Sequence, residues 1–514
     1  MTIIPRPQRL VPGEGSFRLS ADATIAAGPR TEDVAKSFAS RLRAASGFPL
    51  PIRSDGAGQN AIRLYLDAHV PHEEGYRLTV SPDAVEIAAS TAAGLFHGTQ
   101  SLLQLFDRSP FGSGGAGWTL PAVRIDDQPR FAWRDLMLDT GRYFMPVPFI
   151  KRLLDLMAFY KLNIFHWHLT EDQGWRLEIR KYPRLTEVGA WRSETLVGHL
   201  DDKPHRYDGV RHGGFYSQDE VRAVVAYAAE RHITVVPEID MPGHMQAAIA
   251  AYPELGNLGE MLEVSRKWGI NEHVLNVREQ TIRFMEDVLD EVLELFPSPY
   301  VHIGGDECPK TEWRNSAEAQ ARMRALGLAD ENELQSYFIG RIAKYLQDCG
   351  RKPIGWDEIL EGGLAAGATV MSWRGEEGGI TAAKAGHDVI MTPCKGVYFD
   401  YYQSEDRSRE PLAIGGCTTL ETVYSFDPVP DELTDGEAGH VLGTGAKLWT
   451  EYVPSPNQAE YMLFPRLCAF AEVAWSGREA RDYADFLRRL DSHRGHFAAL
   501  GVNYRDWADR GRGD

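Results

Sequence analysis

Eight short apolar segments, separated by stretches with the spacing of amphipathic helices, recur between residues 135 and 448. Strands that alternate with helices in this way are typical of parallel βαβ units. The predicted strands are Asp135–Asp139, Ile164–Leu169, Thr234–Ile239, Tyr300–Ile303, Lys352–Trp356, Ala368–Ser372, Asp388–Thr392 and Val441–Leu448. Most of them end in polar or aromatic residues, as barrel strands do where they meet an active-site face. We therefore predict an α/β fold with a (β/α)8 barrel over residues 129–514, and a doubly wound open sheet is the alternative.

Two of the intervening helices carry clear signals. Ser217 and Glu220 have the spacing of a capping box, in which each side chain satisfies a free backbone amide at the start of a helix. A second helix is predicted over Thr281–Phe296, where Phe284, Val288 and Val292 share one face. Both helices fit the connections of a barrel.

Residues 1–128 read as a small α+β domain. We predict a hairpin in which Ser81-Pro82-Asp83 turns one strand into the next, and a helix that begins at Thr31 and stops at Gly47. The predicted elements are the strands Ile62–Leu66, Tyr76–Val80 and Ala84–Ala89 and the helices Thr31–Ala45 and Ala93–Phe106. The Gly-rich stretch Phe111–Gly117 and the polar residues 126–129 are interpreted as the domain boundary.

Charge and cysteine usage exclude several classes of protein. The formal net charge of −18 over 514 residues argues against binding to nucleic acid or to an anionic membrane, since both need clustered basic residues. The five cysteines form no CxxC pair, so we predict neither a disulfide scaffold nor a metal site, and no cofactor is implied. No signal peptide or long apolar run is visible, so we expect a cytoplasmic protein, or a secreted one whose leader is absent from this chain.

The ends of the predicted strands are rich in carboxylates and tryptophan. No Gly-rich phosphate loop is present, and carboxylates beside aromatic rings suit a neutral, polyhydroxylated ligand. Three acidic pairs lie at strand ends, namely Glu171-Asp172, Asp306-Glu307 and Asp357-Glu358. Composition alone does not choose the catalytic acid among them.

A resemblance makes the choice. His302-Ile303-Gly304-Gly305-Asp306-Glu307 resembles the H-x-G-G-D-E motif of family 20 glycoside hydrolases, the β-N-acetylhexosaminidases. The likeness continues in the family's order through His168–Arg176, Pro237–His244, Gly355–Leu360, Leu448–Glu451 and Phe464–Ser476. The small N-terminal domain also resembles the non-catalytic domain that precedes the barrel in this family.

The resemblance implies an exo-acting, retaining enzyme that removes terminal β-linked GlcNAc or GalNAc from a small oligosaccharide or glycoconjugate. Its catalysis is substrate-assisted, because the 2-acetamido oxygen attacks C1 and forms an oxazolinium ion. Glu307 would be the acid and then the base, Asp306 would accept the acetamido N–H, and Tyr398 would donate to the acetamido oxygen. For both acids to face one ligand, the chain must bend at Gly304-Gly305. We also expect burial to raise the pKa of the acid.

The same resemblance implies the substrate-binding residues. They are Arg142, Asp172, His244, Trp356, Trp373, Asp400, Trp449 and Glu451. Asp172 and His244 would lie behind Glu307, and the three tryptophans would form the walls of the site. Lys447 and Thr170-Glu171 depart from the family pattern; we expect no chemical role for them, only an influence beyond the terminal sugar. The segment Ser193–Tyr216 is interpreted as a lid.

Three alternatives stay open. The chain could be a catalytically silent carbohydrate-binding protein, a sibling enzyme such as a lacto-N-biosidase or 6-sulfo-GlcNAc hydrolase, or a glycosidase with a protein nucleophile. The sequence leaves undecided the preference between GlcNAc and GalNAc, the linkage, the oligomeric state, and the natural source, whether chitin fragments, cell-wall sugars or glycoproteins.

Overall fold

The barrel predicted from the sequence is present. The computed structural model describes residues 1–54, 60–107, 109–112 and 117–508. Eight parallel strands close in the order β16-β17-β18-β19-β20-β21-β8-β9. Their bounds are β8 Trp133–Asp139, β9 Ile164–His168, β16 Thr234–Glu238, β17 Tyr300–His302, β18 Lys352–Trp356, β19 Thr369–Ser372, β20 Val389–Met391 and β21 Val441–Leu448. The alternative of an open doubly wound sheet is therefore excluded.

Helices surround the barrel on its outer side. The main ones are α3 Val147–Phe159, α5 Gln218–Ala229, α7 Glu279–Leu295, α10 Glu331–Asp348, α11 Glu377–Lys384 and α16 Arg466–Trp475. The capping box at the start of α5 is confirmed, with both the Ser217 and the Glu220 side chains in place. Helix α7 begins two residues before the predicted Thr281 and ends one residue before Phe296.

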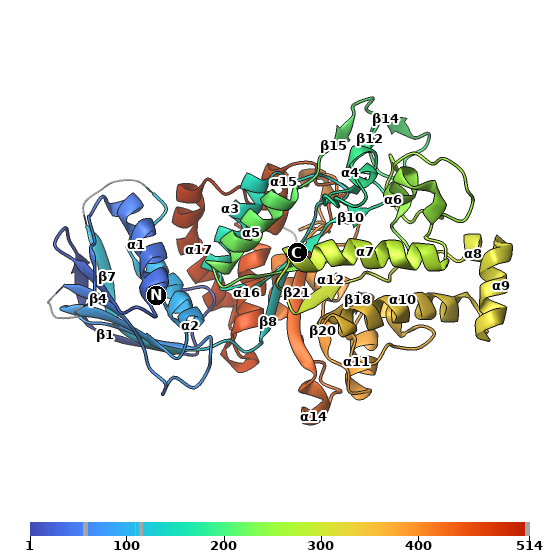
Figure 1. Ribbon diagram of the computed structural model, residues 1–514. Coiled ribbons are helices and arrows are strands. Elements are labelled where there is room, and N and C mark those ends of the chain that lie inside the picture. Colours follow the sequence, from blue (N-terminus) through green and yellow to red (C-terminus); the bar gives the residue numbers. More distant parts are fainter. Residues whose placement is uncertain (55–59, 108, 113–116, 509–514) are drawn as a thin grey trace.

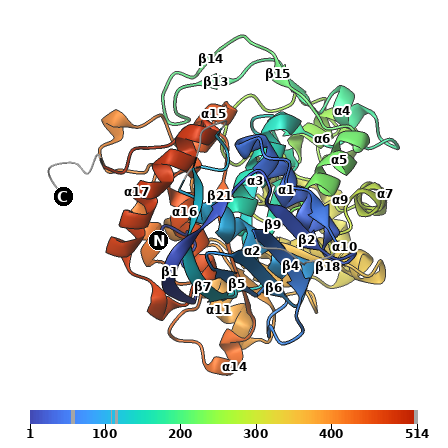
Figure 2. The same cartoon turned by 90° about the vertical axis from the view of Figure 1, so that its left-hand side faces the viewer.

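A seven-stranded sheet forms the N-terminal part, drawn in blue in Figure 1. Its order is β1-β7-β5-β6-β4-β2-β3. The bounds are β1 Arg9–Leu19, β2 Thr24–Ala27, β3 Ile52–Arg53, β4 Ala61–Leu66, β5 Tyr76–Val80, β6 Ala84–Ala89 and β7 Trp118–Asp127. The predicted hairpin is confirmed, since β5 and β6 pair in antiparallel fashion. Helices α1 (Glu32–Ser46) and α2 (Ala92–Leu105) lie between the sheet and the barrel, and the sheet itself faces the viewer in Figure 2.

Two details of this part differ from the sequence prediction, and one lies partly outside the described residues. Strands β1, β2, β3 and β7 were not predicted; β7 covers residues 118–127, mostly between the two predicted boundary segments, and pairs with both β1 and β5. Part of the predicted Gly-rich boundary, residues 113–116, lies outside the described residues. Thr31 precedes α1 but does not cap it, because its hydroxyl donates to the carbonyls of Gly28 and Leu64. Gly47 does end the helix, with a φ of 73°.

Buried ion pairs join the N-terminal sheet to the barrel. Lys161 Nζ lies 3.2 Å from Asp127 Oδ2, and both side chains are 0% exposed. Arg134, also fully buried, lies 2.7 Å from Glu74. The Gln104 side chain of α2 donates to the carbonyl of Phe159 at 2.9 Å. Because breaking a buried pair leaves an uncompensated charge, this contact is costly to open.

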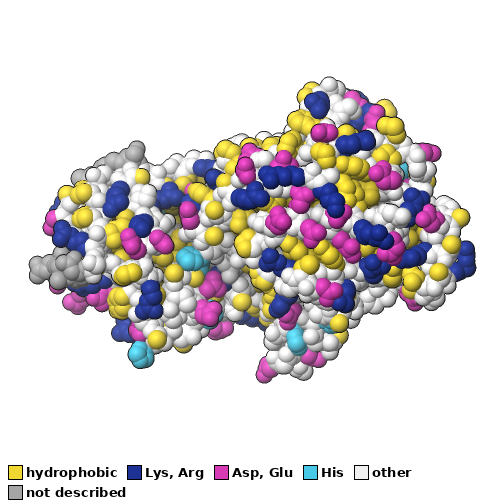
Figure 3. Space-filling model, viewed as in Figure 1, with side chains coloured by type: hydrophobic (Ala, Val, Ile, Leu, Met, Phe, Trp, Pro, Cys, Tyr) yellow, Lys and Arg dark blue, Asp and Glu magenta, His cyan; other side chains and the backbone are white. Residues whose placement is uncertain are grey.

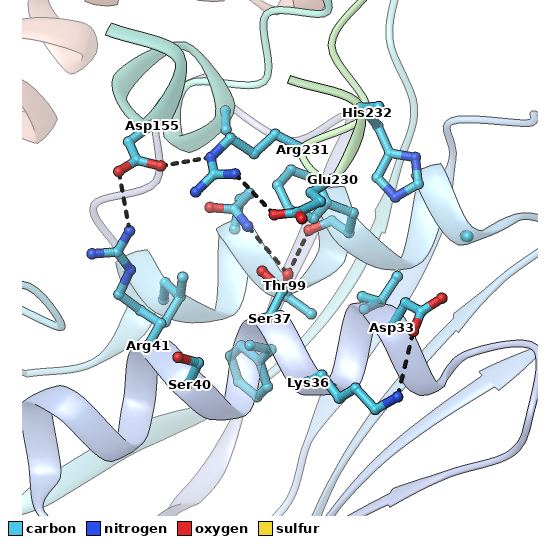
Figure 4. Close-up of a pocket in the computed structure, with 18 of the residues that line it drawn as sticks. Asp33, Lys36, Ser37, Ser40, Arg41, Thr99, Asp155, Glu230, Arg231 and His232 are labelled. Carbon is cyan, nitrogen blue, oxygen red and sulfur yellow. Dashed lines mark hydrogen bonds and ion pairs between the residues drawn. The ribbon is translucent and has the colours of Figure 1, made fainter. Parts of the chain in front are cut away.

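A hollow of about 1050 Å³ lies between the two parts, lined by α1, α2, α3 and α5 (Figure 4). His232 on its wall is followed two residues later by the first residue of β16, so the hollow is at the amino-terminal end of the barrel strands. Its charged side chains bind one another, with Arg231 2.6 Å from Asp155 and 3.6 Å from Glu230. The hollow is therefore separate from the strand ends that carry the predicted site.

Three further features relate to the predictions made from charge, hydrophobicity and cysteine content. None of the helices within the described ranges combines the length and apolar character needed to cross a membrane. On the face shown in Figure 3, basic and acidic side chains are interspersed rather than gathered by sign. All five cysteines are free thiols.

Candidate active site

The residues singled out from the sequence follow the carboxyl ends of the barrel strands, as the active-site residues of such barrels do. By strand they are Arg142 after β8, Glu171 and Asp172 after β9, His244 after β16, Asp306 and Glu307 after β17, Trp356 and Glu358 at β18, Trp373 after β19, Tyr398 and Asp400 after β20, and Trp449 and Glu451 after β21. The closed barrel brings all eight strand ends to one face.

The chain bends sharply after β17, as the glycine pair predicts. Gly304, Gly305 and Glu307 all have positive φ, at 67°, 97° and 43°. A Cβ on Gly304 would lie 1.6 Å from Asp240 Oδ1, so no larger residue fits there. The left-handed turn allows the two neighbouring acids to project toward the same region.

Asp306 is a buried acceptor. Its residue is 7% exposed, and its Oδ1 has no hydrogen-bond partner among the described residues. Burial and the nearby charge of Glu307 raise the pKa of Asp306 to about 6, although His244 opposes the shift. A buried carboxylate oxygen with no donor is energetically costly, and it is matched to an incoming N–H.

Glu307 has a different environment from the one we expected. Its side chain is 31% exposed, and His244 Nε2 lies 3.5 Å from its Oε2. Burial would raise the pKa of Glu307, but the charges of His244 and Arg142 outweigh burial and lower it. The expectation of a raised pKa is therefore wrong for the free protein. The cause is the cationic ring of His244, whose own pKa burial would lower but Glu171 raises well above its ordinary value.

Glu171 has a central place that the sequence analysis missed. Arg142 Nη2 lies 2.8 Å from its Oε1, His168 Nε2 lies 3.2 Å from the same oxygen, and His244 Nδ1 lies 3.1 Å from its Oε2. Despite burial, the Arg142 and His244 charges hold the pKa of Glu171 far below its usual range. The Glu171-Asp172 pair marked the strand end, but sequence does not tell which of two adjacent acids turns inward.

Asp172 lies slightly farther from the imidazole. Its Oδ2 is 3.8 Å from His244 Nδ1, while its Oδ1 accepts the backbone N–H of Gln246 at 2.8 Å. Burial, with the charge of Glu171, raises the pKa of Asp172 to about 6. The structure thus places two acids, not one, behind His244.

Three polar groups on one side of the site have unused hydrogen-bonding capacity. Arg142 Nε, Asp400 Oδ1 and Glu451 Oε2 are buried and have no hydrogen-bond partner among the described residues. Arg142 Nε is 3.9 Å from Glu451 Oε1, too far for a hydrogen bond. Burial raises the pKa of both Asp400 and Glu451. These donors and acceptors can bind adjacent hydroxyl groups.

Aromatic rings line the same face, but unequally. Trp373 is parallel to Tyr398 within 15°, with ring centroids 6.2 Å apart, and Trp449 is 6.4 Å from Tyr398. Trp356 is 0% exposed and donates its indole N–H to Glu238 at 2.8 Å. Trp373 is half-buried and Trp449 is 9% exposed, whereas Trp356 packs behind Trp449 with ring centroids 5.8 Å apart.

Glu238 lies below the site at the centre of a buried histidine cluster. Its carboxylate is close to His166 at 2.8 Å, His168 at 2.6 Å and His302 at 3.1 Å. The group His166, Glu238 and His302 has the geometry to surround a cation. Since Glu238 already accepts hydrogen bonds from His168 and Trp356 and has His166 and His302 beside it, we interpret the cluster as a buried polar network, and the absence of a metal stays a prediction.

Lys447, which departs from the family pattern, and the segment interpreted as a lid are both located in the structure. Lys447 is fully buried and lies 2.7 Å from Asp135, so it cannot reach beyond a terminal sugar as we had expected. Residues 193–216 form small hairpins that project from the body in Figure 1. Tyr452 anchors them, because its hydroxyl accepts the backbone N–H of Leu200 at 3.1 Å and its ring stacks on His199 at 5.2 Å.

Comparison with known proteins agrees with this arrangement. The model of the glycosyl hydrolase family 20 catalytic domain matches residues 131–478, and that of the family's domain 2 matches residues 1–128. A beta-hexosaminidase of Porphyromonas gingivalis is 46% identical over 98% of this chain, which spans 64% of that protein's length. A beta-N-acetylhexosaminidase of Cellulomonas fimi is 33% identical, with 98% of this chain and 96% of the relative covered.

Solved structures give the same result. The family 20 beta-N-acetylhexosaminidase of Streptomyces coelicolor A3(2) superposes with a TM-score of 0.86 at 33% identity, covering 99% of this chain and 98% of that one. A variant of the Streptomyces plicatus beta-hexosaminidase, in complex with its product GlcNAc, has the same TM-score and identity and covers 99% and 97%. With both family models matched along nearly its whole length, the chain belongs to the glycoside hydrolases of family 20.

Proposed function

We propose that the protein is an exo-acting, retaining β-N-acetylhexosaminidase that hydrolyses terminal β-linked GlcNAc or GalNAc by substrate-assisted catalysis. The observation that carries the proposal is the buried Oδ1 of Asp306, which has no donor of its own and lies next to Glu307. An acetamido N–H is a donor of the right kind for this acceptor. Glycoside hydrolases of this family are an exception to the two-carboxylate mechanism, and the acetamido group replaces the protein nucleophile.

The reaction assigns one role to each group. Asp306 accepts the acetamido N–H and so directs the acetamido oxygen, held by the Tyr398 hydroxyl, toward C1. As that oxygen bonds to C1, the glycosidic C1–O bond breaks and Glu307 gives its proton to the leaving oxygen. Glu307 then takes a proton from water, which adds to C1 while the oxazolinium C1–O bond breaks. Two displacements at C1 retain its configuration.

The remaining groups support binding of a single terminal sugar. Arg142, Asp400 and Glu451 each offer a buried donor or acceptor without a protein partner, which suits ring hydroxyls. Trp449 and Trp373 offer aromatic surface for the apolar faces of the sugar and its acetyl group. The structures of relatives that contain N-acetylglucosamine support a small amino-sugar ligand.

The test compares p-nitrophenyl β-N-acetylglucosaminide with the matching β-glucoside. We expect hydrolysis of the first only, and a fall in kcat of about 10²–10⁴ in Glu307→Gln, the range for loss of a general acid or base. Glu318→Gln, an exposed acid paired with Arg278, is the matched control and should leave kcat unchanged. Equal cleavage of both substrates would refute the acetamido mechanism, and binding without turnover would identify a carbohydrate-binding protein.

A further inference from the structure

Glu358 is a second acid close to Asp306 that has no role in the mechanism above. It lies in the short 3-10 helix η2 (Asp357–Leu360), which follows β18. Its side chain is 12% exposed, and its Oε2 accepts the indole N–H of Trp373 at 2.9 Å. This hydrogen bond ties the acid to a ring that is parallel to Tyr398.

No basic side chain among the described residues donates a hydrogen bond to this carboxyl group, and its one ion-pair contact is long. Arg374 is the one basic side chain in ion-pair contact with it within the part of the chain that the structure describes, and its Nε is 3.9 Å from Oε2. The guanidinium is already committed, with Asp357 Oδ1 at 2.8 Å from Nε and Glu361 Oε1 at 2.8 Å from Nη1. The other charged groups that act on Glu358 are the acids Asp306 and Asp357. A mostly buried carboxyl among acids holds its proton, as in sites that use a neutral carboxylic acid at pH 7.

We propose that Glu358 is a positioning residue that works as an uncharged carboxylic acid, fixing the Trp373 indole and leaving Asp306 as the anion beside the acetamido group. The inference rests on the function proposed above. Burial, reinforced by Asp306, raises the pKa of Glu358 to about 9, whereas that of Asp306 rises only to about 6. In the neutral range the proton therefore stays on Glu358, and Asp306 ionises.

This division matters for both the charge and the shape of the site. A developing oxazolinium cation is stabilised by one anion at Asp306, and a second charge nearby would hinder the ionisation of that anion. The hydrogen bond from Trp373 fixes the ring that faces Tyr398, where the acetyl methyl group is expected. Glu358 thus acts through Trp373 and Asp306 and does not touch the reacting atoms.

The test uses Glu358→Gln and Glu358→Ala, with pH profiles of kcat/KM on the N-acetyl substrate and its N-propionyl analogue. Glutamine is uncharged and still accepts the indole N–H, so it should preserve the acidic limb and the ratio of N-propionyl to N-acetyl hydrolysis. Alanine removes the acceptor, and we expect about a tenfold loss on the N-acetyl substrate, the equivalent of one hydrogen bond, with a higher ratio because the ring is free to move. Glu361→Gln, on the far side of Arg374, is the matched control and should change neither quantity.

Two outcomes would overturn the proposal. If Glu358 is charged in the wild type, Glu358→Gln lowers the pKa of Asp306 and moves the acidic limb to lower pH. If Glu358→Ala leaves the N-acyl ratio unchanged, the acid does not position the ring. Trp373→Phe, which keeps a ring but loses the N–H, should reproduce the altered ratio and replaces Glu358→Ala should that variant not fold. A wild type inactive on the N-acetyl substrate would instead refute the proposed function.

Discussion

The two sides of the site balance their charges differently. On the side of β8, β9 and β16, Glu171 is in contact with the cationic or donating groups of Arg142, His168 and His244. On the side of β17, β18 and β20, Asp306, Glu358 and Asp400 accept no hydrogen bond from a basic side chain among the described residues. Glu171 therefore stays ionised, whereas the pKa values of Asp306, Glu358 and Asp400 on the second side are raised, as is that of Asp172 beside Glu171. We conclude that the ionised Glu171, held by its basic neighbours, lies opposite carboxyl groups whose protonation can change when a ligand binds.

The largest effect is expected for Asp306→Asn, which tests the side with raised pKa values. Since the amide cannot stabilise the developing cation, we expect kcat on the N-acetyl substrate to fall by about 10²–10³. The temperature midpoint of unfolding should change little, because the buried Oδ1 of Asp306 has no hydrogen-bond donor and its Oδ2 is only 3.7 Å from His244 Nε2, beyond hydrogen-bond distance. Asp135→Asn is the control, because Asp135 is a buried acid that does have a cationic partner. The substitution leaves Lys447 without its carboxylate at 2.7 Å and should lower the midpoint. A large drop in the midpoint for Asp306→Asn would show that Asp306, like Asp135, is stabilised by a charged partner.

Arg142→Lys tests the paired side. A lysine ammonium keeps the charge but loses the planar fork that reaches Glu171 and, at 3.4 Å, Asp139. We expect kcat/KM to fall by about 10–100-fold, since bidentate contacts to hydroxyl and carboxylate groups are lost. Steady-state kinetics should show the change mainly in KM if Arg142 binds the ground state. A change confined to kcat would place Arg142 in the reaction step instead.

The smallest expected effect is a shift of pH dependence in His244→Gln. The cationic ring lowers the pKa of Glu307, so its removal raises that pKa. The acid then stays protonated to higher pH, and the alkaline limb of kcat/KM should move upward. His273→Gln is the matched control, because His273 pairs with Glu312 at 2.7 Å and does not contact Glu307. A limb that moves downward or stays in place would show that another group controls it.

The barrel could be predicted because its signal is local. Each strand is a short apolar run, and each helix of the α5 type carries its own cap and apolar stripe. Strands β1 and β7 were missed because their polar outward residues and the irregular pairing between Pro12 and Ser16 weaken the alternating pattern. The domain boundary at residue 128 stays a prediction.

The site was predictable as a set of residues but not as a network. Resemblance supplied Asp306 and Glu307, and the glycine pair explained how both face one ligand. The pairing of Glu171 with Arg142 and His244 depends on side-chain directions after β9, which sequence does not specify. The lowered pKa of Glu307 was missed for the same reason, since it depends on a 3.5 Å approach of His244. Lys447 was expected to act beyond the terminal sugar because it departs from the family pattern, whereas here Asp135 holds it inside the barrel.

The ion pairs between the N-terminal sheet and the barrel have a consequence for folding. Glu74 and Asp127 are the counter-ions of Arg134 and Lys161, two cations fully enclosed on the barrel side. Separating the two parts would deprive both cations of their carboxylate partners, and breaking a buried pair in this way costs several kcal/mol. The barrel therefore depends on the smaller part as a permanent intramolecular subunit, and proteolytic nicking near residue 128 should yield fragments that stay associated rather than an independent catalytic barrel.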